Sequence, residues 1–445
     1  MTEEKTTSGS AGYAGRLGRL IRLRTVSDYG EEPGFPELIA ELEALFPALF
    51  AASEKESFGG SLLLRWHGEN KNGGDPILLM NHHDVVEAEG QWTHPPFSGT
   101  AAEGKVWGRG TLDTKGGLFC MMQAAEELAA DGFVPERDVY FVSSCNEETT
   151  GSGADAISAE LEKRKIRFSL CLDEGGMIMY DPVGCTDGTF AMVGMGEKGC
   201  ADLKFIARSN GGHASTPGKN TPIAALAAFV TEAERKKLFR AELSPTVCEM
   251  FRRMAPKMKG LLRFLCGHPR LFSPLLTAVV PGISPTTNAM FRTTVAFTTC
   301  RGSESLNAIP EEAYVTGNMR FSHHQGRESS IAEIRALADR FSLETEVLDP
   351  GFSSPVSSCS SEAFSLVSEA VEHVFPGVIT APYICNGASD ARYFTRVCDN
   401  CLRFVPFTID EKQLESIHGA DENVDIAALG KAVEFYKYLI CHIPA

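Results

Sequence analysis

Strand-like and helix-like segments alternate regularly in the first half of the sequence, and this alternation limits the fold more than any other feature. Apolar runs with β-type composition occur at 76–86, 138–148 and 167–176, and runs with helical apolar spacing separate them at 116–132 and 154–166. Strands that alternate with helices form mostly parallel sheets covered by helices on both faces. Such sheets bind ligands beyond the carboxyl ends of their strands, and each of these three strands ends in polar residues. We therefore predict an α/β fold with a site at that edge.

The middle of the chain follows a different order. Its periodic segments read βαββαβ, which predicts a compact α+β unit inserted into the α/β domain. The strands are expected at 201–209, 293–302, 313–322 and 343–350, and the helices at 223–236 and 329–341. The Pro- and Met-rich residues 237–290 are predicted to form an irregular insertion within this unit. We therefore predict a catalytic domain of residues 1–196 and 351–445, interrupted by a smaller domain at 197–350.

Length and charge exclude several classes of protein. A chain of 445 residues normally contains two or more domains. The net charge of −16 disfavours nucleic acid or an anionic membrane as a partner. The most apolar stretch, 261–283, contains three prolines, a histidine and two arginines, so we interpret it as a buried or interface segment and predict no membrane span. The N-terminus lacks a signal-peptide pattern, and thirteen scattered cysteines are typical of reduced side chains, which predicts a cytoplasmic protein.

Acids and histidines gather at the predicted strand ends and in one glycine-rich loop. His82 and Asp84 are two residues apart, so they share a face of an extended strand. Asp113 lies in the loop GRGTLDTKGG before a helix, where a carboxylate can bridge two cations. The other members of the set are Glu147-Glu148 and Asp173-Glu174 at two strand ends and, far downstream, His418. Carboxylates and imidazoles from separate strand ends suit divalent ions, and zinc binds both donor types.

Each of these patterns also has an ordinary structural explanation when it is taken alone. His82 and Asp84 can simply be the polar end of a strand, and Asp113 can be a helix N-cap. The adjacent glutamates can form a solvated loop. The prediction of a metal centre therefore depends on the patterns occurring together.

A dinucleotide-dependent oxidoreductase is the alternative function. Gly151-x-Gly153 opens a GxGxxA pattern between a predicted strand and a predicted helix, and Asp173 follows at about the 20-residue spacing of a ribose-binding acid. In this interpretation the neighbouring glutamate pair would lie beside the pyrophosphate, where two more negative charges repel it. We therefore favour metal-dependent hydrolysis.

Eight motifs occur in the order found in the M20 metallopeptidases, and the chain resembles this family from about residue 80 to residue 425. The motifs are NHHDVV, WTHPPFSG, GRGTLDTKGG, CNEETTGSGA, LDEGG, GGHAS, NAIP and IHGADENV. The segments LDEGG, NGASDARYF and RFVPFTIDEKQLESIHGADE are most similar to the carboxypeptidase S and N-acyl-amino-acid hydrolase branch. The resemblance implies a zinc-exopeptidase-like catalytic domain with an inserted lid or dimerisation domain.

The resemblance also implies two zinc ions per subunit that share one bridging carboxylate, Asp113. The remaining ligands would be His82 and Glu174 for one ion, and Glu148 and His418 for the other. Asp173 stays open as the alternative to Glu174. Co²⁺ or Mn²⁺ suits the same oxygen and nitrogen donors.

Further residues take catalytic roles by the same resemblance. Glu147 would be the general base, and Asp84 would orient His82. His213, in GGHAS, would polarise the scissile carbonyl, often from the partner subunit of a homodimer. The implied reaction is hydrolysis of an amide by a water molecule that the metal ions activate.

The resemblance places Asn307 and Arg392 at the substrate carboxylate, and an arginine suits bidentate binding of that group. An ion pair between Arg392 and Asp390 explains the arginine equally well. His83 and Asn146 stand where relatives usually carry other residues, and neither replaces a proposed ligand. The expected substrate is a peptide or an N-acyl amino acid, cleaved next to a free carboxylate by a carboxypeptidase, dipeptidase or N-acyl-amino-acid amidohydrolase.

Overall fold

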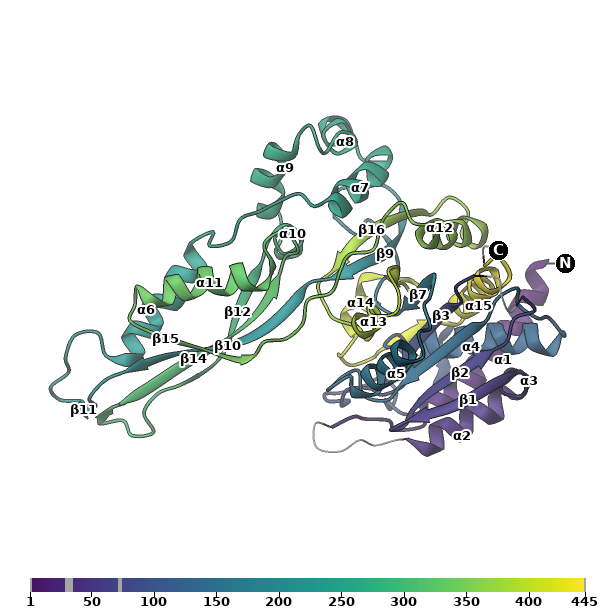
Figure 1. The fold of residues 1–445 in the computed structure, drawn as a ribbon, viewed down its shortest axis with the longest axis horizontal. Coiled ribbons are helices and arrows are strands. Elements are labelled where there is room, and N and C mark those ends of the chain that lie inside the picture. Colours follow the sequence, from purple (N-terminus) through teal and green to yellow (C-terminus); the bar gives the residue numbers. More distant parts are fainter. Residues whose placement is uncertain (1, 29–34, 71–73, 444–445) are drawn as a thin grey trace.

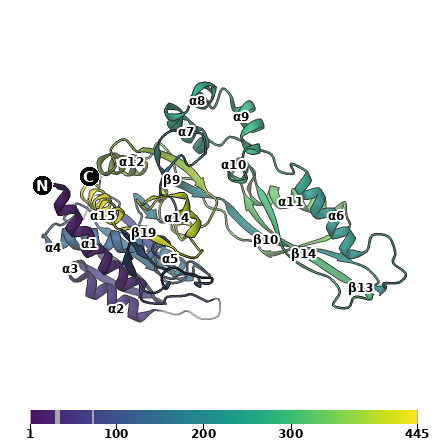
Figure 2. The same ribbon diagram turned by 180° about the vertical axis from the view of Figure 1, so that it is seen from behind.

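The computed structural model describes residues 2–28, 35–70 and 74–443 and places them in a broad main body and a narrower arm (Figure 1). The first helix, α1 (Thr2–Ile21), packs beside the last helix, α15 (Ile426–Cys441), so the two ends of the described chain lie on the main body (Figure 2). The arm consists of elements from the middle of the sequence.

A mixed, mostly parallel sheet forms the centre of the main body. Its strands run in the order β1-β2-β6-β3-β7-β17-β9-β8-β18, and β16 pairs with β9. The pairs among β6, β3, β7 and β17 are parallel, whereas β1 and β2 add antiparallel strands at one side. The bounds are β1 (Ser53–Phe58), β2 (Ser61–Trp66), β3 (Ile77–His82), β6 (Val139–Ser144), β7 (Leu170–Asp173), β8 (Ile178–Tyr180), β9 (Thr189–Glu197), β16 (Ile379–Cys385), β17 (Cys401–Arg403) and β18 (Thr408–Ile409). The predicted α/β class is confirmed.

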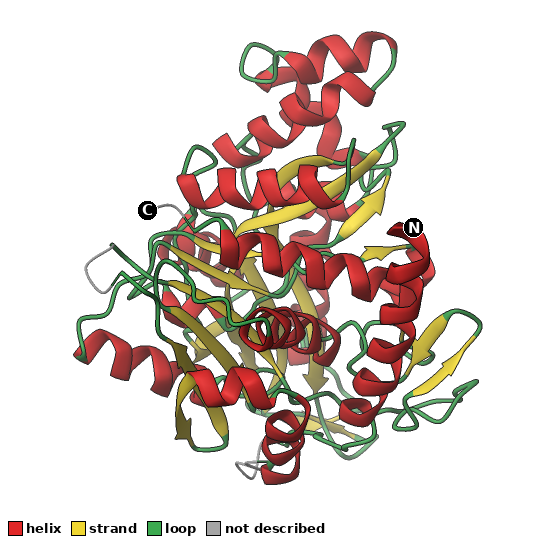
Figure 3. Ribbon diagram, turned by 90° about the vertical axis from the view of Figure 1, so that its right-hand side faces the viewer, coloured by secondary structure: helices red, strands yellow, loops and turns green. Residues whose placement is uncertain are grey.

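Helices cover this sheet on both faces (Figure 3) because its central strands are apolar on both sides. Along β3, Ile77 and Leu79 belong to a core with α4 (Lys115–Ala130), α12 (Glu362–Val374) and α15, whereas Leu78 and Met80 belong to a second core with α5 (Ser152–Lys163) and α13 (Ala391–Phe394). Successive side chains on a strand point to opposite faces, so one apolar run supplies both cores.

The arm is built on a four-stranded antiparallel sheet with the order β12-β14-β10-β15. Side chains along β14 alternate between buried and partly exposed, and the buried face packs against two helices. The bounds are β10 (Gly199–Arg208), β12 (Thr294–Arg301), β14 (Glu312–Phe321), β15 (Glu344–Asp349), α6 (Pro222–Arg235) and α11 (Gly326–Asp339). The predicted βαββαβ order is therefore confirmed. A short pair, β11 (Gly212–His213) with β13 (Ala308–Ile309), lies near the tip of the arm (Figure 1).

The prediction of an irregular insertion at 237–290 is wrong, because most of this segment is helical. It contains α7 (Pro245–Met254), α8 (Gly260–Gly267), α9 (Ser273–Val279) and α10 (Pro285–Phe291), with 3-10 turns at Ala255–Lys257 and Val280–Gly282. Prolines at 245, 274 and 285 occupy the first turns of α7, α9 and α10, where the missing N–H is not needed. The helices pack on the main sheet, since Met250 and Phe251 share a core with Phe190 and Ala381.

The remaining elements complete the main body. They are α2 (Pro36–Leu45), α3 (Pro47–Ala52), α14 (Glu411–Ser416) and a small sheet of β4 (Thr100–Ala102), β5 (Lys105–Trp107) and β19 (Asn423–Asp425). None of the described helices combines the length and the apolar character needed to cross a bilayer.

Candidate metal centre and active site

The carboxyl ends of β6, β3 and β7 lie side by side and bring distant residues into one pocket. Because these neighbouring strands are parallel, the residues that follow each strand meet at one edge of the sheet. The loop before α4 and the loop after α14 reach the same edge. The pocket has a volume of about 270 Å³, and its lining includes Asp113, Glu147, Glu148, Glu174 and His418.

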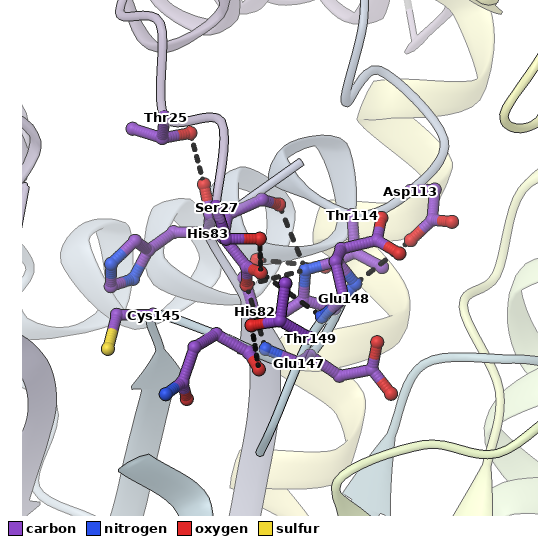
Figure 4. A network of polar contacts seen from close by, with 12 residues as sticks. Thr25, Ser27, His82, His83, Asp113, Thr114, Cys145, Glu147, Glu148 and Thr149 are labelled. Carbon is purple, nitrogen blue, oxygen red and sulfur yellow. Dashed lines mark hydrogen bonds and ion pairs between the residues drawn. The ribbon is translucent and has the colours of Figure 1, made fainter. Parts of the chain in front are cut away.

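Asp113 lies between two histidines from distant parts of the chain. Its Oδ1 atom is 2.9 Å from Nε2 of His82, and its Oδ2 atom is 3.0 Å from Nε2 of His418. Nε2 of His418 is also 3.3 Å from Oε2 of Glu148. One donor atom each from His82, Asp113 and Glu148 lies within 4.8 Å of the others, and Figure 4 shows these three side chains converging. A carboxylate whose two oxygens face different imidazoles has the geometry of a bridge between two ions.

Asp84 connects His82 to the glutamate pair. Its carboxylate accepts hydrogen bonds from the backbone N–H groups of Glu147 and Glu148, both at 3.1 Å, and from the hydroxyl of Ser27 at 2.7 Å. Nδ1 of His82 lies 3.0 Å from the backbone carbonyl oxygen of Asp84 and 3.3 Å from the Asp84 carboxylate. Burial raises the pKa of Asp84, but the hydrogen bonds from His82 and Ser27 outweigh burial, and the net pKa is lowered. Asp84 therefore remains ionised and holds Nε2 of His82 toward the pocket.

His83 points away from the pocket, as the alternation of side chains on β3 predicts. Its ring is fully buried, contacts the ring of Phe35, and forms a 2.8 Å hydrogen bond from Nδ1 with the hydroxyl of Ser143. Burial lowers the pKa of His83 to about 3, so the ring is neutral.

The glycines around Asp113 are required by close backbone contacts. Gly110 has φ +89°, a conformation that side-chain-bearing residues rarely adopt. A Cβ atom on Gly116 would lie 2.1 Å from the carbonyl oxygen of Thr111. The loop can therefore turn sharply into α4 and present the Asp113 carboxylate to the pocket.

Glu422 fixes this loop and was missed by the sequence prediction. Its carboxylate accepts N–H groups from Gly110, Leu112 and Asp113 at 3.0, 2.7 and 3.1 Å, and it pairs with Arg109 at 2.8 Å. The motif IHGADENV contains this acid four residues after His418, but its contacts are made with backbone about 310 residues earlier, which no local pattern reveals.

The electrostatics of the pocket fit divalent cations. Burial raises the pKa of Glu147 and of Glu174 well above the ordinary value, and burial together with Asp113 raises the pKa of Glu148. Oε1 of Glu148 is buried and lacks a hydrogen-bond partner among the described residues. Hydrogen bonds with Asp113 and Glu148 raise the pKa of His418 to about 10. Buried acids whose ionised forms lack a compensating positive charge, beside two imidazoles, match the donors of zinc and similar ions.

The two candidates after β7 point in different directions. The Asp173 carboxylate accepts the backbone N–H of Ala391 at 2.7 Å and thus faces α13. Glu174 lines the pocket beside Asp113 and Glu147.

Arg392 lines a second cavity that shares Glu147 and Glu148 with this pocket. Its Nη1 atom is 3.7 Å from Oε1 of Glu147, and its guanidinium lies over the rings of Phe352 and Tyr393. Glu147, Glu148 and Arg392 line the neighbouring cavity, which has a volume of about 700 Å³. Asp390 forms no ion pair with Arg392 in the described part of the chain, although its charge contributes to the raised pKa of the arginine.

His213 and Asn307 lie together but away from the pocket that contains Asp113. They belong to the tip of the arm, where the N–H of Ala214 donates to the carbonyl of Asn307 at 2.9 Å and Nδ1 of His213 is 2.7 Å from the hydroxyl of Ser215 (Figure 1). Both side chains are exposed, and neither lines the pocket that contains Asp113.

In the GxGxxA segment, neighbouring side chains already occupy the place where a phosphate would bind. The backbone N–H of Gly153 donates to Oδ1 of Asn146 at 3.0 Å, and the ring of Tyr393 covers Gly151. A pyrophosphate would have to displace both side chains. The geometry therefore does not support the oxidoreductase alternative.

Comparisons with known proteins find one peptidase family and several similar proteins. The model of Peptidase family M20/M25/M40 matches residues 78–442. The chain is 32% identical over 456 residues to the probable carboxypeptidase S-like 2 of Dictyostelium discoideum, covering 98% of this chain and 86% of that protein. It is 33% identical over 369 residues to the N-fatty-acyl-amino acid synthase/hydrolase PM20D1 of Homo sapiens, covering 82% of this chain and 73% of that protein.

A solved structure shows the same fold at low sequence identity. The M20 family metallo-carboxypeptidase Sso-CP2 of Sulfolobus solfataricus superimposes with a TM-score of 0.66 at 16% identity, and the match covers 95% of this chain and 97% of the other.

Proposed function

Because the chain belongs to peptidase family M20/M25/M40, we propose that this metallohydrolase cleaves an amide bond next to a free carboxylate, in an N-acyl amino acid or at the C-terminus of a peptide. The observation that carries the proposal is the placement of the two Asp113 oxygens between His82 and His418, with Glu147 in the same pocket. Carboxypeptidase S-like and N-fatty-acyl-amino acid hydrolase relatives support this substrate class.

The metal ligands in this proposal are His82, Asp113 and Glu174 for one zinc ion, and Asp113, Glu148 and His418 for the other. Glu174 is preferred to Asp173 because the Asp173 carboxylate already accepts the N–H of Ala391. When bound, two divalent ions supply a Lewis acid for the amide carbonyl and increase the acidity of water.

Glu147 is proposed as the general base. Its carboxylate lines the pocket beside the ligands, and its backbone N–H is held by Asp84. Burial raises its pKa well above the ordinary value, which suits a group that accepts a proton from water and returns it to the leaving amine.

Arg392 is proposed to bind the substrate carboxylate at the edge of the pocket. Its guanidinium lies close to the general base and borders the second cavity, so a carboxylate held there would place the neighbouring amide near Glu147. We further propose a homodimer in which the arm of the partner subunit supplies His213 and Asn307, because both lie away from the pocket of their own chain.

The test is turnover of N-acyl amino acids and dipeptides by zinc-loaded protein, comparing wild type with Glu147→Gln. We expect the variant to lose at least about 100-fold in kcat, since a general base contributes 10²–10⁴-fold. Its metal content, measured by elemental analysis, should stay unchanged. Glu148→Gln should lose metal as well as activity, and the exposed Glu136→Gln should lose neither. If wild type cleaves no such amide, the proposed function is wrong. If Glu147→Gln remains active, the base assignment is wrong.

A further inference from the structure

Positive charge is concentrated in one segment of this acidic protein. Residues 250–292 contain seven Lys or Arg side chains and no Asp or Glu, although the chain has a net charge of −16. Acids outside the segment neutralise part of this charge: Glu249 pairs with Arg252 and Arg253, and Asp187 pairs with Lys259. The segment therefore differs in sign from the rest of the molecule.

Three exposed cations of this segment have no such neutralisation. Lys257, Arg263 and Arg270 are exposed and form no ion pair in the part of the chain that the structure describes. Arg263 belongs to α8, Arg270 precedes α9, and Lys257 ends the 3-10 turn before α8. Lys257 also interacts with the charge of Asp187, and Arg270 lines a cavity together with Glu242 and Glu249, so the charge of Arg263 is the most available to an external anion.

Large apolar side chains are exposed among these cations. Of thirteen exposed large apolar or tyrosine side chains in the described chain, seven lie in the 23 residues from 261 to 283. The seven are Leu261, Leu262, Phe264, Leu271, Leu275, Val279 and Ile283. Leu271 is 72% exposed and Ile283 is 64% exposed. Soluble monomers rarely gather exposed apolar side chains in this way unless the surface binds something.

None of these side chains belongs to the core that holds α8 and α9 on the protein, although the ring of Phe264 contacts that of Phe272. Cys266 on α8 and Leu276 on α9 are buried in the core shared with α7 and β16, and the rings of Phe264 and Phe272 lie 5.3 Å apart between the two helices. Figure 1 shows α8 and α9 at the outer edge of the molecule, on the side of α7 away from the main sheet. The exposed apolar side chains belong to no core of the described residues and form the outer face of these helices, where Leu271 also borders a cavity of about 1040 Å³.

We propose that this outer face docks on the surface of an anionic lipid bilayer. We call it the docking face and define it as Leu261, Leu262, Phe264, Leu271, Leu275, Val279 and Ile283 with Lys257, Arg263 and Arg270. Apolar side chains enter the boundary between headgroups and acyl chains, while Lys and Arg bind the anionic headgroups around them. The proposal uses no residue of the candidate metal centre. A negative result for membrane binding would therefore not contradict the hydrolase function, and a negative result for hydrolysis would not contradict membrane binding.

Charge complementarity favours a bilayer over a second copy of the chain. A two-fold contact through the docking face would bring the same patch on both subunits together, so Arg263 and Arg270 would approach like charges. An anionic bilayer offers apolar depth and negative charge at the same surface, which matches both kinds of side chain.

The first test is sedimentation of the full-length protein with vesicles of phosphatidylcholine and phosphatidylserine. We expect wild type to sediment with the vesicles, and Leu261→Ser/Ile283→Ser to bind at least about tenfold more weakly, because both changes remove exposed apolar surface. The matched control is Val134→Ser/Leu348→Ser, which removes exposed apolar side chains elsewhere and should bind like wild type. A wild type that stays in the supernatant, or a control that loses binding equally, overturns the proposal.

The second test concerns charge. Each cation near an anionic surface strengthens binding about fivefold, so Arg263→Glu/Arg270→Glu should weaken binding by more than about 20-fold. The exposed Arg335→Glu should not weaken it to a similar extent. Vesicles of phosphatidylcholine alone, or a higher salt concentration, should also reduce binding. Equal binding to both kinds of vesicle contradicts the choice of an anionic surface.

Analytical ultracentrifugation without vesicles tests whether a second copy of the chain, rather than a bilayer, occupies the docking face. If Leu261→Ser/Ile283→Ser dissociates a wild-type dimer, the docking face is a contact between subunits and the bilayer proposal is wrong. If the variant and wild type have the same oligomeric state, the loss of vesicle binding belongs to the bilayer contact.

Discussion

Asp84 shows how much of the candidate centre depends on one buried carboxylate. It orients His82 and at the same time accepts the N–H groups of Glu147 and Glu148. Asp84→Asn would leave an amide N–H₂ facing those N–H donors, so the glutamate loop and the imidazole should both shift. We expect zinc affinity to fall about 10- to 100-fold, as it does when such supporting groups are lost. Calorimetric zinc titration measures this, and the exposed Asp131→Asn should titrate like wild type.

Arg392 allows a test of carboxylate recognition that is separate from catalysis. Arg392→Ala should lower kcat/KM for a free N-acyl amino acid by about 10- to 100-fold, the value of a hydrogen-bonded ion pair, and leave the methyl ester of the same substrate nearly unchanged. An equal loss on acid and ester would mean that Arg392 acts by holding Glu147, 3.7 Å away, rather than by binding substrate.

Sequence reasoning could identify the candidate residues that lie at strand ends. His82, Glu148 and Glu174 follow parallel strands, and parallel strands necessarily bring their ends together. It could not identify Glu422, nor the buried pair of Glu197 with Arg403, which joins residues 206 positions apart. These ion pairs join residues that are far apart in the sequence, and no periodic pattern in a single sequence reveals them.

At the scale of elements, Lys198 joins the main sheet to the arm. It lies between β9 and β10, is buried, and donates to the carbonyls of Ala289 and Arg292 at 3.1 and 2.8 Å. Burial, with a contribution from Arg320, lowers its pKa from 10.5 to about 7. Between these two pH values the unfolded chain keeps a proton that the folded chain has lost, so this residue makes stability rise with pH in that window.

The measurement is urea unfolding at a series of pH values for wild type and Lys198→Met. The free energy of unfolding of wild type should gain up to about 1.4 kcal/mol per pH unit relative to the variant between pH 7 and 10.5, and nothing below pH 7. The exposed Lys412→Met should leave the wild-type slope intact. Parallel curves for Lys198→Met and wild type would contradict the lowered pKa.

Periodicity predicted the alternating strands and helices well, because each buries one or two apolar faces. The prediction failed for residues 237–290, because the prolines in this segment suggested an irregular chain rather than helices. In the structure, three of those prolines begin helices α7, α9 and α10, so their position within the element mattered more than their number.

At the scale of the whole molecule, the distance between the arm tip and the pocket predicts shared active sites. Glu147→Gln and His213→Ala should each be inactive as pure proteins. Mixed subunits should recover about a quarter of wild-type activity, because half of randomly mixed dimers are hybrid and each hybrid has one intact site. Activity after co-refolding measures this. No recovery would mean that each chain uses its own His213.

Net charge also needs to be interpreted at this scale. A total of −16 predicts repulsion from anionic surfaces, but residues 250–292 contain seven cations and no acid, and three of these cations are exposed without an ion pair among the described residues. An average over the chain therefore says little about the surface that a partner meets.

The two histidines of the centre differ in their contact with solvent: the His82 side chain is 1% exposed and that of His418 is 55% exposed. An ion beside His418 should exchange quickly, whereas one beside His82 should be trapped by the surrounding protein. A stopped-flow chelator experiment should then show two phases of zinc release. If it does, cobalt could replace zinc at the site beside His418, where exchange is rapid. The product would hold one zinc ion and one cobalt ion, and its visible spectrum would report on the site beside His418 alone.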